Sequence, residues 1–127
     1  PGEDITVFCY GLMVNYCLQA ADILANDGID AEVVDLRTVY PLDKATIIER
    51  SQRTGKVLLV TEDNLEGSIM SEASAIIAEN CLFDLDAPIM RLAAPDVPSM
   101  PFSPTLENEI MMNPEKIQDK MRELAQF

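Results

Sequence analysis

Acidic side chains and a glycine at the ends of apolar runs are the residues of this chain that could do chemistry. Glu62 and Asp63 follow the apolar run Lys56–Thr61, and two adjacent carboxylates can share a metal ion or act as general acid and base. Neighbours on an extended chain point in opposite directions, however, which favours a solvated loop. Gly11 ends an earlier apolar run without a G-x-G-x-x-G or P-loop pattern. We interpret it as a backbone turn, with phosphate binding as the alternative.

Two further charged residues lie within predicted regular elements. Glu72 falls near the N-terminal end of a predicted helix, where the helix dipole favours a carboxylate in any case. Arg91 is the only basic residue between Val57 and Glu115, in a region rich in acids. We expect it to form a structural ion pair, with an anion contact across an interface as the alternative.

Histidine is absent from the sequence, and this excludes several kinds of catalytic site. A Ser-His-Asp triad, a Cys-His dyad and most zinc sites all require it. Cys9, Cys17 and Cys81 are widely spaced, without a C-x-x-C pair. With no histidine to activate them, we expect these cysteines to be small core residues in a reducing cytosol rather than nucleophiles.

The chain is strongly acidic. Nine basic and 22 acidic residues give a formal net charge of −13 over 127 residues. Such a field repels phosphate backbones, which argues against nucleic-acid binding. Its two explanations are solubility and an acidic docking surface for a basic partner. No apolar run reaches the roughly 18 residues of a membrane span, and Pro1-Gly2-Glu3-Asp4, which lacks a starting methionine, reads as a processed or excised segment without a signal peptide.

Apolar periodicity alternates between strand and helix along the whole chain. The predicted strands are Ile5–Tyr10, Ala31–Leu36, Lys56–Thr61 and Ile89–Ala93, and the predicted helices are Leu12–Asn26, Asp43–Arg53, Gly67–Cys81 and a last one starting at Asn113-Pro114. The strands are almost continuously apolar, as burial on both faces by helices requires. This order predicts an α/β fold with a mainly parallel sheet, in one domain over residues 1–127.

Six short motifs in a fixed order carry a family resemblance. The first, Asp35-Leu36-Arg37-Thr38 with Tyr40-Pro41-Leu42-Asp43, resembles the DLRT-x-x-PLD segment of the β subunits of thiamine-diphosphate-dependent 2-oxoacid dehydrogenases. The other five are Thr6–Gly11, Thr54-Gly55-Lys56, Leu85–Arg91, Asp96–Pro101 and Asn113-Pro114. Together they resemble the C-terminal domain of transketolase-like proteins, and most nearly that of the E1 β subunit.

The resemblance implies a three-layer α/β/α sandwich that is a fragment of a longer E1 β or fused E1 chain. In this family an extra antiparallel edge strand lies just before the segment matching Pro1, and the preceding domain binds thiamine diphosphate and Mg with the α subunit. The resemblance therefore implies no catalytic, cofactor-binding or metal-binding residue in this chain, which alone should neither decarboxylate a 2-oxoacid nor bind the cofactor. The full cytoplasmic enzyme would carry out oxidative decarboxylation.

Partner contacts are also implied by the resemblance. In the family, the C-terminal domain joins the α subunit and a second β subunit and docks the basic peripheral-subunit-binding domain of E2. The residues placed near the E2 site are Asp86 and the chain-terminal carboxylate of Phe127, with Asp84 as either a docking or a turn residue. A subunit interface is expected at the helix Gly67–Cys81 and at the proline-rich loop Asp96–Pro104, which contains Met100, Pro101 and Phe102.

The chain departs from the family at two places. Many members carry His-Glu-Ala where this chain has Thr61-Glu62-Asp63, and the glycine-rich G-G-F-G-A-E is here Glu66–Glu72. A different 2-oxoacid or interface, or a divergent paralogue, would explain both changes. Two alternatives stay open: an independent small-molecule-binding α/β domain that uses a crevice beside Gly11 and Glu62, and the C-terminal domain of another transketolase-like enzyme.

Overall fold

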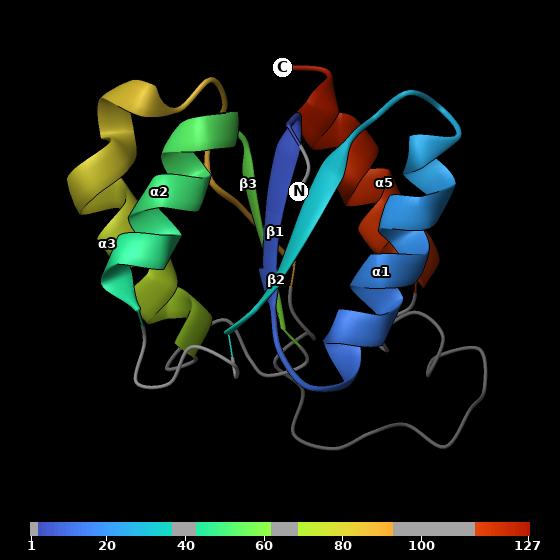
Figure 1. Cartoon of the computed structure of the whole chain (residues 1–127), viewed down its shortest axis with the longest axis horizontal. Helices are drawn as coiled ribbons and strands as arrows, with labels where there is room; N and C mark the ends of the chain where they lie inside the picture. Colours follow the sequence, from blue (N-terminus) through green and yellow to red (C-terminus); the bar gives the residue numbers. More distant parts are fainter. Residues whose placement is uncertain (1–2, 37–42, 62–68, 93–113) are drawn as a thin grey trace.

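The computed structural model describes residues 3–36, 43–61, 69–92 and 114–127 (Figure 1). Its strands are β1 (Ile5–Cys9), β2 (Ala31–Asp35), β3 (Val57–Val60) and β4 (Met90–Leu92). Its helices are α1 (Leu12–Ala25), α2 (Lys44–Thr54), α3 (Ile69–Cys81), the short 3-10 helix η2 (Leu82–Asp84) and α5 (Pro114–Ala125). The predicted elements are therefore confirmed, with ends that differ by one or two residues.

The described strands form one parallel sheet in the order β2-β1-β3-β4. The central strand β1 pairs on both sides, so that Val7 lies opposite Val33 of β2 and Leu58 of β3. Because the chain turns to one side after β1 and to the other after β2, the order of strands reverses between β1 and β3. In open α/β sheets, ligands bind at the carboxyl ends of the strands beside such a reversal.

Helices cover both faces of the sheet: α1 and α5 pack on one side and α2 and α3 on the other (Figure 1). Successive strand residues point to opposite faces. Ile5, Val7 and Cys9 accordingly join one core cluster, while Phe8 and Tyr10 join the second. The side chains of the central strands β1 and β3 are buried on both faces, and the predicted three-layer α/β/α sandwich is confirmed.

Helix α2 has the start and the stop that its sequence predicts. The Asp43 carboxylate caps it by accepting hydrogen bonds from the Thr46 amide (3.2 Å) and hydroxyl (2.7 Å). These bonds hold the pKa of the Asp43 carboxyl below its usual range. At the other end, Gly55 adopts the left-handed conformation (φ +71°), and its amide donates to the Ser51 carbonyl (2.9 Å).

Strand β2 contains one buried carboxylate, a feature that its apolar pattern does not predict. Glu32 is only 8% exposed, and its two oxygens pair with the guanidinium groups of Arg50 and Arg53 on α2. Two hydrogen-bonded ion pairs compensate for the removal of this charge from water. Glu32 therefore ties the edge strand of the described sheet to the helix layer above it.

The three cysteines are free and buried, as expected. Cys9 on β1 and Cys17 on α1 belong to the same core cluster. A hydrogen bond to Cys9, together with burial, raises the pKa of the Cys17 thiol, and burial also raises that of Cys81. All three belong to the two core clusters, and the raised pKa makes the Cys17 and Cys81 thiols poor nucleophiles. In the described ranges, no helix is long and apolar enough to cross a membrane.

Candidate functional site

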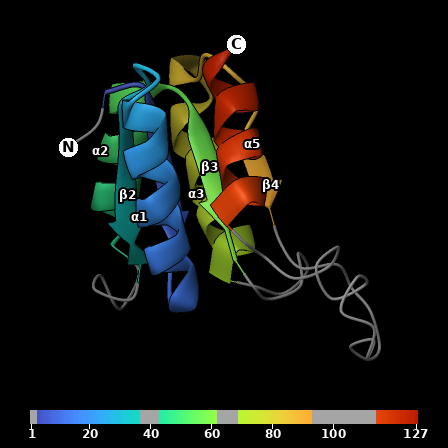
Figure 2. The ribbon, with the colours of Figure 1, turned by 90° about the vertical axis from the view of Figure 1, so that its right-hand side faces the viewer.

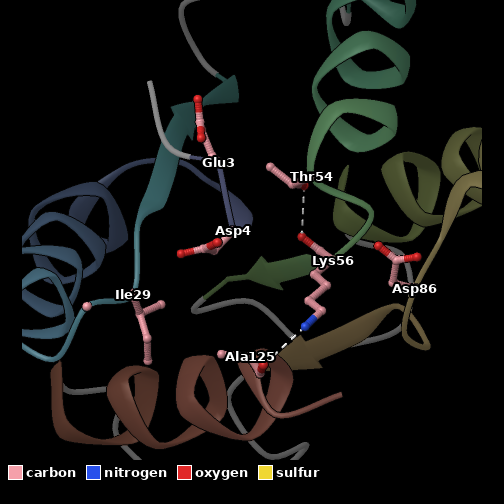
Figure 3. A pocket seen from close by; sticks show the side chains of 8 residues that line it. Glu3, Asp4, Ile29, Thr54, Lys56, Asp86 and Ala125 are labelled. Atoms are coloured by element: carbon pink, nitrogen blue, oxygen red, sulfur yellow. Dashed lines mark hydrogen bonds between the residues drawn. The ribbon is translucent and has the colours of Figure 1, made fainter.

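The amino-terminal ends of β1 and β3 lie at one edge of the sheet, and a cleft of about 460 Å³ opens there (Figure 3). Segments distant in the sequence meet around it, because the ends of α2 and α5 come back to the same edge. Its lining includes Glu3, Asp4, Ile29, Lys56, Asp86 and Ala125. Three of these six side chains are acidic and one is basic, so the cleft is polar and mainly negative. We call it the amino-edge cleft.

Lys56 links the sheet to the C-terminal helix. Its Nζ donates hydrogen bonds to the main-chain oxygens of Ala125 (3.0 Å; Figure 3) and Phe127 (2.8 Å). The last carbonyls of a helix have no partner within the helix, and a cation there also opposes the negative end of the helix dipole. Lys56 therefore ties the end of α5 to the start of β3, next to Phe127, which is 57% exposed.

Asp86 is exposed but held in place by Gly55. The Asp86 amide donates to the Gly55 carbonyl at 2.7 Å. A Cβ atom added to Gly55 would lie 2.6 Å from Oδ2 of Asp86 and 3.0 Å from the carbonyl oxygen of Asp84. The carboxylate of Asp86 thus occupies space that any residue other than glycine would fill. Glycine at position 55 therefore has two roles: it adopts the left-handed conformation that ends α2, and it leaves room for the Asp86 carboxylate.

Asp84 is anchored to the same end of α2. Its Oδ2 accepts a hydrogen bond from the Gln52 side-chain amide at 3.2 Å, while the side chain remains exposed. This bond explains how the turn before Pro88 is fixed. Asp84 therefore has a structural role in the turn, and its exposed carboxylate adds negative charge next to Asp86.

The structure brings the two predicted docking residues to one place. Asp86 contacts Gly55, Phe127 contacts Lys56, and Gly55 and Lys56 are neighbours in the chain. Glu3 and Asp4 add acidic groups from the beginning of β1. Sequence reasoning did not single out Lys56, Glu3 or Asp4. The predicted parallel sheet could have indicated them, because the amino-terminal ends of parallel strands lie at the same edge of the sheet.

The carboxyl edge of the sheet contains the second predicted crevice, beside Gly11. Gly11 has φ +64° and ψ −140°, a conformation open essentially to glycine alone. This geometry gives it a backbone role in the turn into α1. Nearby, the hydroxyls of Tyr10 and Thr61 form a buried hydrogen bond of 3.0 Å, and Glu62 and Asp63 lie outside the described residues.

For several residues singled out in the sequence, the described part of the chain contains no contact that supports the expected role. Met100, Pro101 and Phe102 lie outside those ranges. Glu72 is exposed in the first turn of α3. Arg91 is exposed on β4 and pairs with no carboxylate of the described residues, so its expected ion pair is not found there. The described residues also include no group of three side chains able to hold a metal ion.

Taken together, the parallel sheet, its two helix layers and a C-terminal helix tied to the amino edge define an α/β/α domain of the transketolase C-terminal type. Residues 1–117 match the family described as "Transketolase, C-terminal domain". The chain belongs to this family. The resemblance found in the sequence motifs is therefore confirmed.

Curated relatives match along almost the whole chain. The chain is 67% identical over 126 residues to the 2-oxoisovalerate dehydrogenase subunit beta of Bacillus subtilis (strain 168), covering 99% of this chain and 38% of that protein. It is 38% identical to the mitochondrial pyruvate dehydrogenase E1 component subunit beta of Dictyostelium discoideum, covering 98% of this chain and 35% of that one. The chain thus spans little more than a third of these relatives.

Among solved structures, the chain resembles one described as a split gene transketolase, inactive beta4 tetramer. The TM-score is 0.84 at 23% identity, covering 99% of this chain and 40% of the other. At this identity the likeness shows a shared fold. It agrees with the three-layer architecture described above.

Proposed function

We propose that this chain is the non-catalytic assembly and docking domain of a thiamine-diphosphate-dependent 2-oxoacid dehydrogenase E1. Relatives named as β subunits of such enzymes, matched over nearly all of the chain, support this proposal. The relative at 67% identity is named for 2-oxoisovalerate, and we infer the same 2-oxoacid for the full enzyme. That enzyme would work in the cytoplasm, joined by an α subunit and a second β subunit.

Thiamine diphosphate and Mg²⁺ belong, in this proposal, to the rest of the full enzyme. Magnesium held with a diphosphate needs carboxylate or carbonyl oxygens that converge on one point. Among the described residues, no group of three His, Cys, Asp or Glu side chains is placed to hold a metal ion. The task of this domain is instead to hold partners in position.

The partner that we propose for the amino-edge cleft is the basic peripheral-subunit-binding domain of E2. One observation carries this proposal: Asp86 packs on Gly55, and Phe127 accepts a hydrogen bond from Lys56, the next residue in the chain. With Asp84 and the acids of the cleft, they would attract lysine and arginine side chains. Exposed contacts of this kind are worth ~1 kcal/mol each, are weakened by salt, and act mainly on the association rate.

Docking can be tested with the full E1 and the E2 domain at low and high salt. We expect Asp86→Ala to raise Kd by about threefold to tenfold, mostly through slower association, and removal of Phe127 to weaken binding similarly. Asp22→Ala is the matched control, because it removes one exposed carboxylate from α1, away from the cleft. Unchanged affinity in both cleft variants, with no salt dependence, would leave the acidic surface a matter of solubility.

For subunit assembly, we propose α3 and the segment containing Met100, Pro101 and Phe102. The described residues of α3 support a place for this helix at a subunit interface. Ala75 and Ala78 are exposed on its outer face, and small residues allow another backbone to approach closely.

A further inference from the structure

The most exposed apolar side chains of the described residues are adjacent in the chain. Phe83 is 100% exposed and Leu82 is 61% exposed, both in η2. Scattered single apolar residues on a surface are normal. Two consecutive large apolar residues, one of them a fully exposed phenylalanine, are unusual. Burial of the ring would stabilise the fold, and this stabilisation is lost while the ring stays in water.

Firm anchors on both sides hold these two residues outward. Before them, Cys81 is fully buried, and its thiol lies 3.7 Å from the Ile48 carbonyl. After them, Asp84 is hydrogen-bonded to Gln52 and Asp86 to Gly55. The exposure of Phe83 is therefore a property of an ordered turn. A partner that covers a group already held in place loses little conformational entropy on binding.

The Leu82–Asp86 segment adjoins the amino-edge cleft. The carbonyl oxygen of Asp84 lies 3.0 Å from the position of a Cβ on Gly55, and the next residue, Lys56, holds Phe127. Both ribbon views show the turn between α3 and β4 at the same end of the molecule as the C-terminus (Figures 1 and 2). The turn that contains Phe83, Asp84 and Asp86 thus lies at the same end of the domain as the C-terminus.

We propose that Leu82 and Phe83 form the apolar anchor of the docking surface and are covered by an apolar side chain of the same basic partner. The inference rests on the proposed function. Charge complementarity selects this occupant, since the sequence from Ala78 to Met90 contains three acids and no base. Protein interfaces commonly bury an aromatic residue centrally and leave charges at the rim. Here Phe83 would fix the lifetime of the complex, and Asp84 and Asp86 would set its rate of formation.

The test measures association and dissociation rates of the E2 domain on the full E1 at two salt concentrations. We expect Phe83→Ala to raise Kd by about tenfold or more, through faster dissociation and with an unchanged salt dependence. Leu82→Ala should have the same effect at a smaller size. Leu18→Ala is the matched control, because Leu18 is a 47% exposed residue on α1, and it should change neither rate.

The outcomes separate this inference from the proposed function. If the unmodified E1 does not bind the E2 domain, the proposed function is wrong, and so is the proposal that Leu82 and Phe83 form an anchor. If Asp86→Ala weakens binding while Phe83→Ala leaves both rates unchanged, only the anchor is wrong. If Phe83→Ala instead alters the sedimentation of E1 itself, the segment is a contact between subunits, which also overturns the anchor.

Discussion

Replacing Gly55 with alanine is expected to lower the free energy of unfolding of the 127-residue chain by about 2–4 kcal/mol. Two costs add. Alanine at φ +71° is strained, and its Cβ would meet the Asp86 carboxylate at 2.6 Å and the Asp84 carbonyl oxygen at 3.0 Å. The carboxylate can rotate away, but the main-chain carbonyl moves only with η2. The same variant should therefore also displace Asp86 and weaken docking.

Gly28→Ala is the matched control for this prediction. Gly28 has φ +81°, but no atom lies within 4 Å of the position of its Cβ. It should show the conformational cost alone, about 1–2 kcal/mol. Urea unfolding gives the free energy of unfolding of each variant. If the m values are equal, the difference between the two losses measures the packing of the Asp84–Asp86 turn on Gly55. Equal losses in both variants would mean that the turn does not pack on Gly55 in solution.

The second large effect is expected at Phe8, measured against the same substitution at Phe83. Phe8 lies on β1, is 0% exposed and packs between the sheet and the α2–α3 layer. Phe8→Ala should cost about 3–5 kcal/mol, from lost burial and the cavity left behind. Phe83 is 100% exposed, so Phe83→Ala should change stability by no more than about 0.5 kcal/mol.

Thermal or urea unfolding of this pair shows whether the Phe83 ring has a role in folding. A small effect of Phe83→Ala on stability, together with a large effect on E2 binding, is the combination that an anchor requires. A loss above about 1 kcal/mol for Phe83→Ala would show that the ring packs within the chain. In that case the reduced affinity of the variant could no longer be attributed to a lost contact with the partner.

Local sequence signals predicted the elements of this fold well because local chemistry determines them. Asp43 caps α2 as its type and position indicate, and Gly55 ends the same helix with a positive φ. The buried stripe of α1 consists of residues at helical spacing. Each of these features depends on a few consecutive residues, and a single sequence displays them directly.

Contacts between distant segments were not predictable in the same way. Lys56 reaches Phe127 across 71 positions in the chain, and Asp86 rests on Gly55 across a whole helix. Glu32 stands in an apolar run, and its burial depends on two arginines of the following helix. The sequence does not single out Phe83, since only the completed turn shows that its ring is exposed to water.

Amide hydrogen exchange of the full E1, with and without the E2 domain, tests most directly whether the amino edge of the sheet is the docking surface. We expect added protection over residues 82–87 and 125–127, since Asp86 and Ala125 line the cleft and η2 and Phe127 lie next to them in the chain. Residues 10–12, at the turn beside Gly11, should exchange at unchanged rates. Protection at that carboxyl edge, with none at the amino edge, would contradict the assignment of the docking surface.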